Sequence, residues 1–203
     1  MAPPKVYIFW DNSNIYVGAK DAHAVNIMAR GGLRISFENI YKLALVNRPL
    51  GAAHAVGSVP PEDRDVWSAF AAKTGIQPEL FERGSLSRTE QAVDQALQVH
   101  ILRALADEDE PQIAVLLTGD GKGFDTGTGF HADLLRMHKK GWGIEVLSWS
   151  HTCAKALREF AENSGCFVQL DDFIDSITYV KGVRQQIPLN LKKRRTAKPR
   201  EAR

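Results

Sequence analysis

Three aspartates in this sequence adjoin apolar segments, in positions where their carboxylates could act together on one cation. Asp11 directly follows the apolar run Val6–Trp10, and Asp120 closely follows the apolar run Ile113–Thr118. Asp94 lies in the first turns of a long expected helix. Close carboxylates repel each other and raise each other's pKa, so a cluster of them usually implies a cation. A set of oxygen ligands favours Mg²⁺ or Mn²⁺ over zinc.

Asp94 is the most informative of the three because it falls on the apolar side of its helix. At about 100° per residue, it lies inside an arc that contains Val93, Leu97, Ile101 and Leu105. A carboxylate on a buried face is costly unless it is paired or bound to a metal. The arc therefore predicts that Asp94 has a cation or another partner.

Each aspartate also has a simpler interpretation. Asp94 could stabilise the positive end of its helix dipole, an effect of about 0.3–1 kcal/mol. Asp11 begins an Asp-Asn-Ser-Asn run and could cap a helix or a turn. Asp120 lies between two glycines and could belong to a plain turn. The convergence of all three acids on one edge of a sheet favours a metal site over three separate explanations.

The elements that must position these acids alternate along the chain between short apolar runs and longer segments with helical periodicity. Strands are expected at Val6–Trp10, Ala52–Val59, Ile76–Glu82, Ile113–Thr118, Gly143–Trp149 and Phe167–Leu170. Helices are expected at Phe37–Val46, Glu62–Lys73, Thr89–Ala106, Phe130–Lys140 and Thr152–Asn163, and around Phe173. This alternation predicts an α/β fold with a mostly parallel sheet. Ligands of such sheets bind outside the carboxyl ends of the strands, where Asp11, Asn14 and Asp120 are expected.

Size and composition predict a single soluble domain. A chain of 203 residues with 44% hydrophobic residues can bury a sizeable core. Its two cysteines, Cys153 and Cys166, form neither a disulfide framework nor a metal-binding CxxC pair. We expect a cytoplasmic protein without membrane partners, because no signal peptide and no apolar run of about 18 residues is evident.

Charge is distributed unevenly. From Lys181 onward there are nine Lys and Arg and one acid, whereas the preceding part has 17 basic and 23 acidic residues, a net charge of −6. A basic tail on an acidic body suits an anionic polymer as partner, although it could also simply keep the protein soluble. Beyond Pro188 the composition predicts disorder. We therefore expect a domain over residues 1–180 and a basic, disordered tail over residues 181–203.

Three short segments resemble the NYN domain proteins, a branch of the PIN-like nuclease superfamily. They are Val6–Ile15, Gln91–Asp94 and Val115–Asp120, and the resemblance extends over roughly residues 5 to 180. It implies a single-domain, Rossmann-like three-layer α/β/α sandwich. It also implies an acidic pocket of Asp11, Asp94 and Asp120, with Asn14 as a polar helper near the metal. The implied activity is metal-dependent cleavage of RNA phosphodiester bonds with Mg²⁺ or Mn²⁺.

The sequence departs from the family pattern at two positions. Relatives typically carry a second aspartate two residues after Gly-Asp, where this chain has Lys122, and often an acid near the place of His100. Asp125 or Asp133 could supply the missing ligand, and Lys122 could contact a phosphate or neutralise the pocket. The alternative function is a catalytically impaired module that binds RNA or recruits a protein.

Further residues are candidates for contact with RNA, whether single-stranded or structured. The basic tail residues Lys192, Lys193, Arg194 and Arg195 could bind phosphates. A loop with five glycines between residues 119 and 129 could form an anion-binding nest or a flexible connection. Tyr16 and Trp149 could stack on bases or belong to the core. PIN-like domains often pair, so a homodimer is a further expectation.

Overall fold

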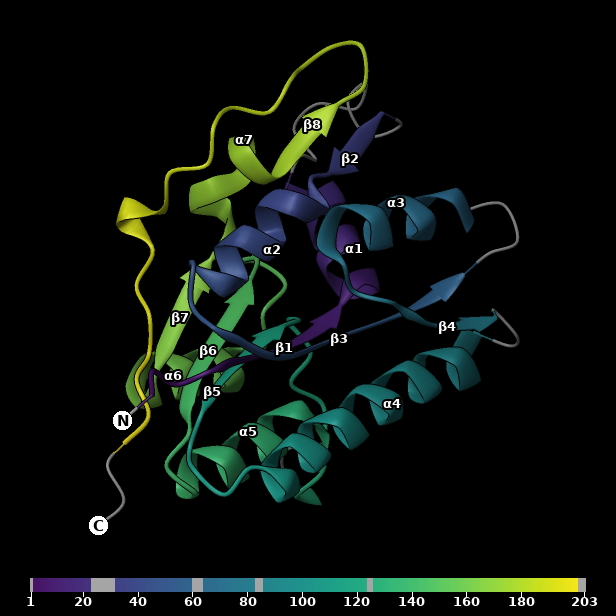
Figure 1. Ribbon diagram of the computed structural model, residues 1–203. Helices are drawn as coiled ribbons and strands as arrows, with labels where there is room; N and C mark the ends of the chain where they lie inside the picture. The colour runs from purple at the N-terminus through teal and green to yellow at the C-terminus, as the bar shows by residue number, and fades with distance from the viewer. Residues whose placement is uncertain (1, 23–31, 60–63, 83–85, 124–125, 201–203) are drawn as a thin grey trace.

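A six-stranded parallel sheet lies at the centre of the computed structural model, which describes residues 2–22, 32–59, 64–82, 86–123 and 126–200 (Figure 1). Its order is β4-β3-β1-β5-β6-β7. The strands are β1 (Val6–Asp11), β3 (Leu50–Val59), β4 (Glu79–Glu82), β5 (Ile113–Leu117), β6 (Gly143–Ser148) and β7 (Cys166–Gln169). Neighbouring strands pair in parallel, and Trp10 of β1 lies opposite Leu117 of β5. The carboxyl ends of β1 and β5 are therefore adjacent.

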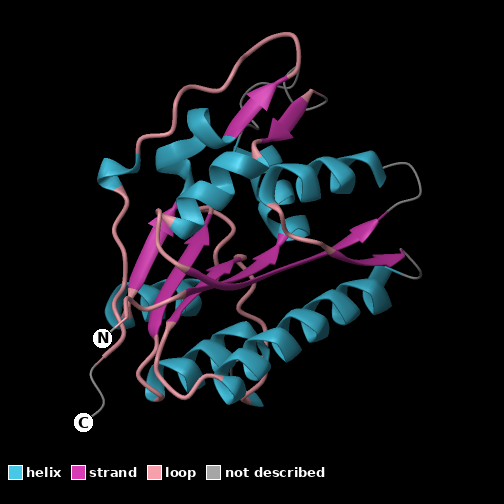
Figure 2. Cartoon of the chain, in the orientation of Figure 1, coloured by secondary structure: helices cyan, strands magenta, loops and turns pink. Residues whose placement is uncertain are grey.

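Helices cover both faces of the sheet and confirm the expected three-layer α/β/α architecture (Figure 2). One face carries α1 (Asn12–Ala22), α2 (Phe37–Leu45), α3 (Arg64–Thr74) and α7 (Ile174–Ile177). The other carries α4 (Leu86–Asp107), α5 (Gly129–Lys139) and α6 (Lys155–Ser164). Alternate residues of β1 serve the two cores, since Trp10 packs with the first group of helices and Phe9 with the second. Within the described ranges, no helix is both apolar and long enough to cross a membrane.

Helix α1 and the small antiparallel sheet of β2 (Leu33–Ile35) and β8 (Thr178–Val180) have no counterpart among the expected elements. The polar start of α1 resembles a turn, and its stability comes from tertiary packing. Gly18 lies so close to the Trp149 ring that an added Cβ would be 2.3 Å from Cδ1. The strands β2 and β8 span three residues each, too short for a recognisable alternation.

The C-terminal segment, residues 189–200, packs against the sheet, whereas the composition predicts disorder. In Figure 1 this segment is drawn in yellow, and it passes beside β7 toward the N-terminus of the chain. The Arg194 guanidinium is fully buried and bonds the carboxylate of Glu145, which is itself fully buried in β6. Arg48 completes the ion pair with two bonds of 2.6 and 3.0 Å, and the Ala197 N–H donates to Glu145 at 2.8 Å. A buried carboxylate needs such partners, and this requirement orders the segment.

Loss of the Arg194 guanidinium is expected to destabilise the domain. Arg194→Met should lower the free energy of unfolding by about 3 kcal/mol, because it leaves a buried carboxylate with one cation instead of two. Urea unfolding of the variant and of wild type measures this difference. Arg195→Met is the matched control, since the Arg195 side chain is exposed. Equal midpoints for the two variants would show that Glu145 does not depend on Arg194.

Candidate functional site

Asp11 and Asp120 meet at the carboxyl ends of the adjacent strands β1 and β5. The Asp11 side chain is nearly buried, with 5% of its surface exposed. The Thr118 hydroxyl donates to Asp11 Oδ2 at 3.1 Å and accepts the Asp120 N–H at 3.2 Å. Thr118 therefore ties the two aspartates together. Sequence reasoning took Thr118 only as the last residue of a strand and missed this role.

Asn14 forms the second link between the two strand ends. Its backbone N–H donates to Asp11 Oδ1 at 3.1 Å, so Asp11 does cap the first turn of α1. The Asn14 side-chain oxygen accepts the Gly119 N–H at 2.8 Å. The structure thus shows that Asp11 caps a helix, and its role in a metal pocket stays a prediction. The structure places Asn14 beside Asp11, as expected from the sequence.

The surroundings of the Asp11 carboxylate disfavour its charged form. Burial raises its pKa from 3.8 to about 6, against hydrogen bonds from Asn14 and Thr118 that lower the pKa. The negative charge of Asp120 raises the pKa further. A cation beside the pair would offset both burial and repulsion.

Asn12 is a buried polar residue that directly follows Asp11 in the chain. It is 7% exposed, and its side-chain oxygen has no hydrogen-bond partner among the described residues. The carboxylates of Asp11 and Asp120 offer oxygen donors alone, a chemistry that fits Mg²⁺ or Mn²⁺. The Asp-Asn-Ser-Asn run in the sequence indicated a polar site and a set of helix-capping residues equally well.

The glycines after β5 permit close packing against the start of α6. A Cβ on Gly119 would lie 2.8 Å from the Thr152 carbonyl oxygen, and the Ala154 N–H donates to the Gly119 carbonyl. A Cβ on Gly121 would lie 2.5 Å from that of Ala154. This close approach fixes the backbone on either side of Asp120.

Asp133 of α5 lies at the interface with α4. Its Oδ2 accepts a hydrogen bond from Gln98 of α4 at 3.0 Å, and its Oδ1 accepts one from Arg136 within α5 at 2.8 Å. Asp94 is half-buried one turn before Gln98, toward the end of α4 that starts near the strands' carboxyl edge (Figure 1). Asp125 lies outside the described residues.

Within the described ranges, no group of three or more His, Cys, Asp or Glu side chains is arranged to hold a metal. The structure brings together Asp11 and Asp120, and the participation of Asp94 stays a prediction. Mg²⁺ is commonly held by one or two carboxylates together with waters and substrate phosphates, so a pair is a sufficient protein contribution.

Lys122 and His100 occupy different surroundings. The exposed Lys122 side chain places Nζ 3.9 Å from Asp120 Oδ2, and the Lys122 N–H donates to Oδ1 at 2.9 Å. His100 stacks on His54 with ring centroids 3.9 Å apart, and its Nε2 lies 3.1 Å from Glu79 Oε2. These contacts place His100 against β3 and β4, whereas Lys122 lies directly beside the aspartate pair.

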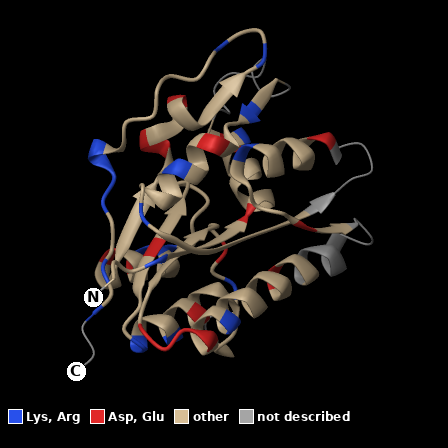
Figure 3. Ribbon diagram, viewed as in Figure 1, with Lys and Arg blue, Asp and Glu red and all other residues tan. Residues whose placement is uncertain are grey.

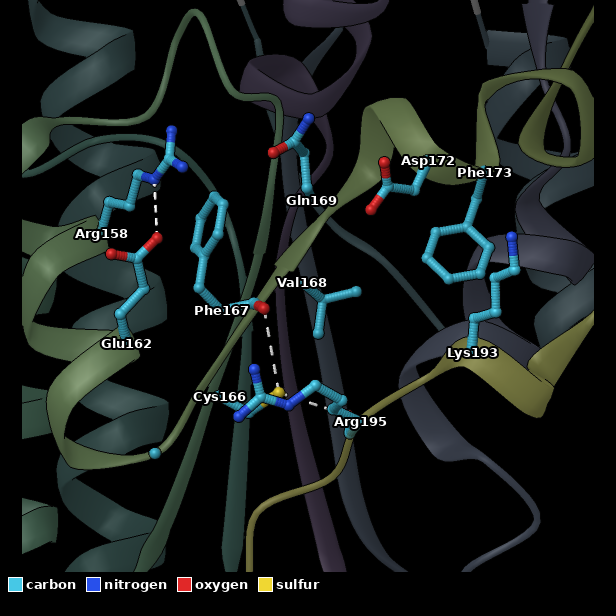
Figure 4. Close-up of a pocket in the computed structure, with 11 residues that line it drawn as sticks. Arg158, Glu162, Cys166, Phe167, Val168, Gln169, Asp172, Phe173, Lys193 and Arg195 are labelled. Atoms are coloured by element: carbon cyan, nitrogen blue, oxygen red, sulfur yellow. Dashed lines mark hydrogen bonds and ion pairs between the residues drawn. The ribbon is translucent and has the colours of Figure 1, made fainter.

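The four basic residues of the expected tail separate into two groups. Arg194 is buried, so its predicted contact with RNA is wrong in this structure, whereas Lys192, Lys193 and Arg195 are exposed. Lys193 and Arg195 line a pocket of about 340 Å³ between the C-terminal segment, β7 and α6 (Figure 4). On its far side Arg158 is bonded to Glu162 at 2.9 Å.

The two aromatic candidates also differ. Trp149 is fully buried, and its indole N–H donates to the Ile15 carbonyl at 2.9 Å. It therefore belongs to the core and has no face free for a base. Tyr16 is half-buried on the outer side of α1, and Lys20 Nζ lies 4.4 Å from the centroid of its ring.

Comparisons with known proteins identify the family and the fold of this chain. The sequence profile of the NYN domain matches residues 5–165 of the chain. A solved structure of a protein of unknown function from Vibrio parahaemolyticus RIMD 2210633 has a TM-score of 0.61 and 18% identity, and the match covers 84% of this chain and 94% of that chain. At this identity the likeness shows the fold alone. No curated protein matches the chain.

The raised pKa of Asp11 predicts a pH-dependent effect of Asp11→Asn on stability. The folded state binds the Asp11 proton more tightly than the unfolded chain, so wild-type stability falls as pH rises from 3.8 to about 6. The asparagine removes this loss and should raise the free energy of unfolding by about 1–3 kcal/mol at pH 7.5. Urea unfolding at several pH values measures the gain, which should disappear below pH 4. A gain that does not change with pH would contradict the proposed burial of charge.

Proposed function

Because this chain belongs to the NYN domain family, a branch of the PIN-like nuclease superfamily, we propose that it is a metal-dependent ribonuclease. The observation that supports this most directly is the pair of Asp11 and Asp120, joined by Thr118 at the carboxyl ends of β1 and β5. Burial and repulsion disfavour two negative charges there, so the pair is suited to a cation. RNA is the proposed substrate and Mg²⁺ or Mn²⁺ the proposed cofactor.

Each residue has a distinct proposed role. Asp11 and Asp120 hold the cation, with Asp94 as a further ligand from α4. Asn14 and Thr118 fix the carboxylate of Asp11 through hydrogen bonds to its two oxygens. When bound, the cation would activate water and offset the charge that develops on the phosphate.

A second candidate function follows from Lys122. Its ammonium group lies where it competes with a cation for Asp120, at 3.9 Å from Oδ2. A chain whose pocket is neutralised in this way would be an RNA-binding or protein-recruiting module without catalysis. The two functions differ in one observable property, the metal-dependent cleavage of RNA.

The first test measures that cleavage directly. Labelled single-stranded RNA is incubated with the protein in Mn²⁺, in Mg²⁺ and in EDTA. We expect cleavage in the metal ions only, and Asp11→Asn and Asp120→Asn should each slow it by about 100-fold or more. Asp109→Asn, which changes an exposed acid in the loop after α4, is the matched control and should cleave at the wild-type rate. Intact RNA with wild-type protein would favour the module without catalysis.

The second test addresses Lys122. Lys122→Asp replaces the competing cation with a carboxylate and should lower the Mn²⁺ concentration for half-maximal cleavage by about tenfold. Lys122→Ala removes the charge without adding a ligand, so its effect should be smaller. If both variants lose cleavage while wild type is active, Lys122 contacts the substrate instead of weakening the metal site.

A further inference from the structure

A groove of about 1000 Å³ lies between α1, α3 and the β2–β8 sheet. Asn12 and Ser13 line it, and they directly follow Asp11 in the chain. The groove therefore begins next to the strand end that carries Asp11, although the Asp11 and Asp120 side chains do not line it. Neither the NYN profile nor the fold comparison gives this groove a role.

Basic side chains predominate in the groove. Among the described residues that line it, two are acidic, Glu38 and Asp65, and five are basic: Lys20, Arg34, Lys73, Lys181 and Arg184. Glu38 is bonded to Lys42 at 2.5 Å and Arg184 to Asp175 at 3.1 Å, so one lining acid and one lining cation are each paired. Figure 3 shows the basic residues on β2 and on the loop after β8. The chain before Lys181 carries a net charge of −6, and two of the groove's cations, Lys181 and Arg184, come from the basic C-terminal part.

Aromatic rings alternate with these cations. The pleat of β2 buries Leu33 and Ile35 and exposes Arg34, which lies directly opposite the half-buried Tyr179 of β8. On the other wall, Lys20 lies over the ring of Tyr16. Each wall thus presents one ring and one cation side by side.

We infer that this groove binds single-stranded RNA beside the strand end that carries Asp11. Cations along a groove follow a phosphate backbone, and aromatic rings between them stack on bases. Only unpaired bases expose their faces to such rings, so a single strand fits better than a duplex. The choice of RNA over DNA rests on the proposed ribonuclease function, whereas the groove's chemistry stands on its own residues.

The first experiment measures RNA binding separately from cleavage. A fluorescent 12-nucleotide oligouridylate is titrated with protein in EDTA, and its anisotropy is followed at several salt concentrations. The double variant Lys20→Ala/Lys73→Ala should weaken binding by about tenfold at low salt. It should also reduce the slope of log affinity against log salt by about 1.4, or about 0.7 for each lost phosphate contact. The matched double variant Lys139→Ala/Lys140→Ala removes two exposed cations at the end of α5, on the opposite face, and should bind like wild type.

The second experiment tests stacking. Tyr16→Ala should weaken binding by at least about fivefold, whereas Tyr16→Phe keeps the ring and should stay within about twofold of wild type. Tyr179→Ala tests the opposite wall with a ring on a different element. Thermal unfolding of each variant separates a lost contact from a lost fold, because a variant with the wild-type midpoint has kept its structure.

The outcomes distinguish the groove from the catalytic proposal. Loss of binding in the groove variants, in a protein that does not cleave RNA, supports the groove and rejects the ribonuclease function. Unchanged binding in both sets of variants, or no binding of oligouridylate by wild type, overturns the groove. Equal affinity for duplex RNA with no effect of Tyr16→Ala overturns the single strand as ligand. If a polyglutamate peptide binds more tightly than RNA, the ligand of the groove is an acidic protein and the proposal of RNA is overturned.

Discussion

The structure of the site depends on one buried carboxylate, that of Asp11. It lies at the end of the central strand, where it receives a backbone N–H from α1 and a hydroxyl from the residue after β5. The first bond joins β1 to the helix that directly follows it, and the second joins β1 to a residue 107 positions away in the sequence. Because burial disfavours the charge of Asp11, the hydrogen bonds and the nearby Asp120 decide in which protonation state it rests. Asp11 therefore caps a helix and links the ends of β1 and β5 by hydrogen bonds. Its buried carboxylate also favours a cation over an anion at this edge of the sheet.

The order of the sheet makes this arrangement possible. With β1 between β3 and β5, the end of β1 has neighbours on both sides. The turn after β5 packs directly against the residues that precede α6, where a side chain at position 119 or 121 would not fit, and Gly119 and Gly121 make this close approach possible. Asn12 and Ser13, which directly follow β1, line the basic groove. The carboxylate pair and the cations of the groove thus come from neighbouring parts of the fold.

The sequence predicts the sheet well because its strands are buried and continuous. The expected Ile113–Thr118 and Gly143–Trp149 differ from β5 and β6 by one residue each. Of the site, the pairing of Asp11 with Asp120 and the place of Asn14 follow from strand ends alone. Helix α1 does not follow, because its polar first turn gains stability from the Asp11 cap and from packing on Trp149.

The role of Arg194 illustrates a different limit. Composition describes the average behaviour of a segment, and a Lys- and Arg-rich stretch is usually solvated. Here a single acid in an otherwise apolar strand, Glu145, requires a partner, and Arg194 reaches it from 49 residues away. Glu145 was the residue that indicated a buried ion pair, since a carboxylate in a central strand must have a partner. The sequence indicates that Glu145 needs a positively charged partner, but it does not indicate which Lys or Arg fills that role.

The ion pair of Glu145 also sets an order of events during synthesis of the chain. The last strand of the sheet, β7, is complete at Gln169, and Arg48 is by then available to Glu145. Arg194 is translated 25 residues after Gln169, so the second cation arrives only after the whole sheet has left the peptidyl transferase centre. At about 5–20 residues per second, that interval lasts a few seconds. The second cation can therefore reach Glu145 only after Arg48 and every strand of the sheet have been synthesised.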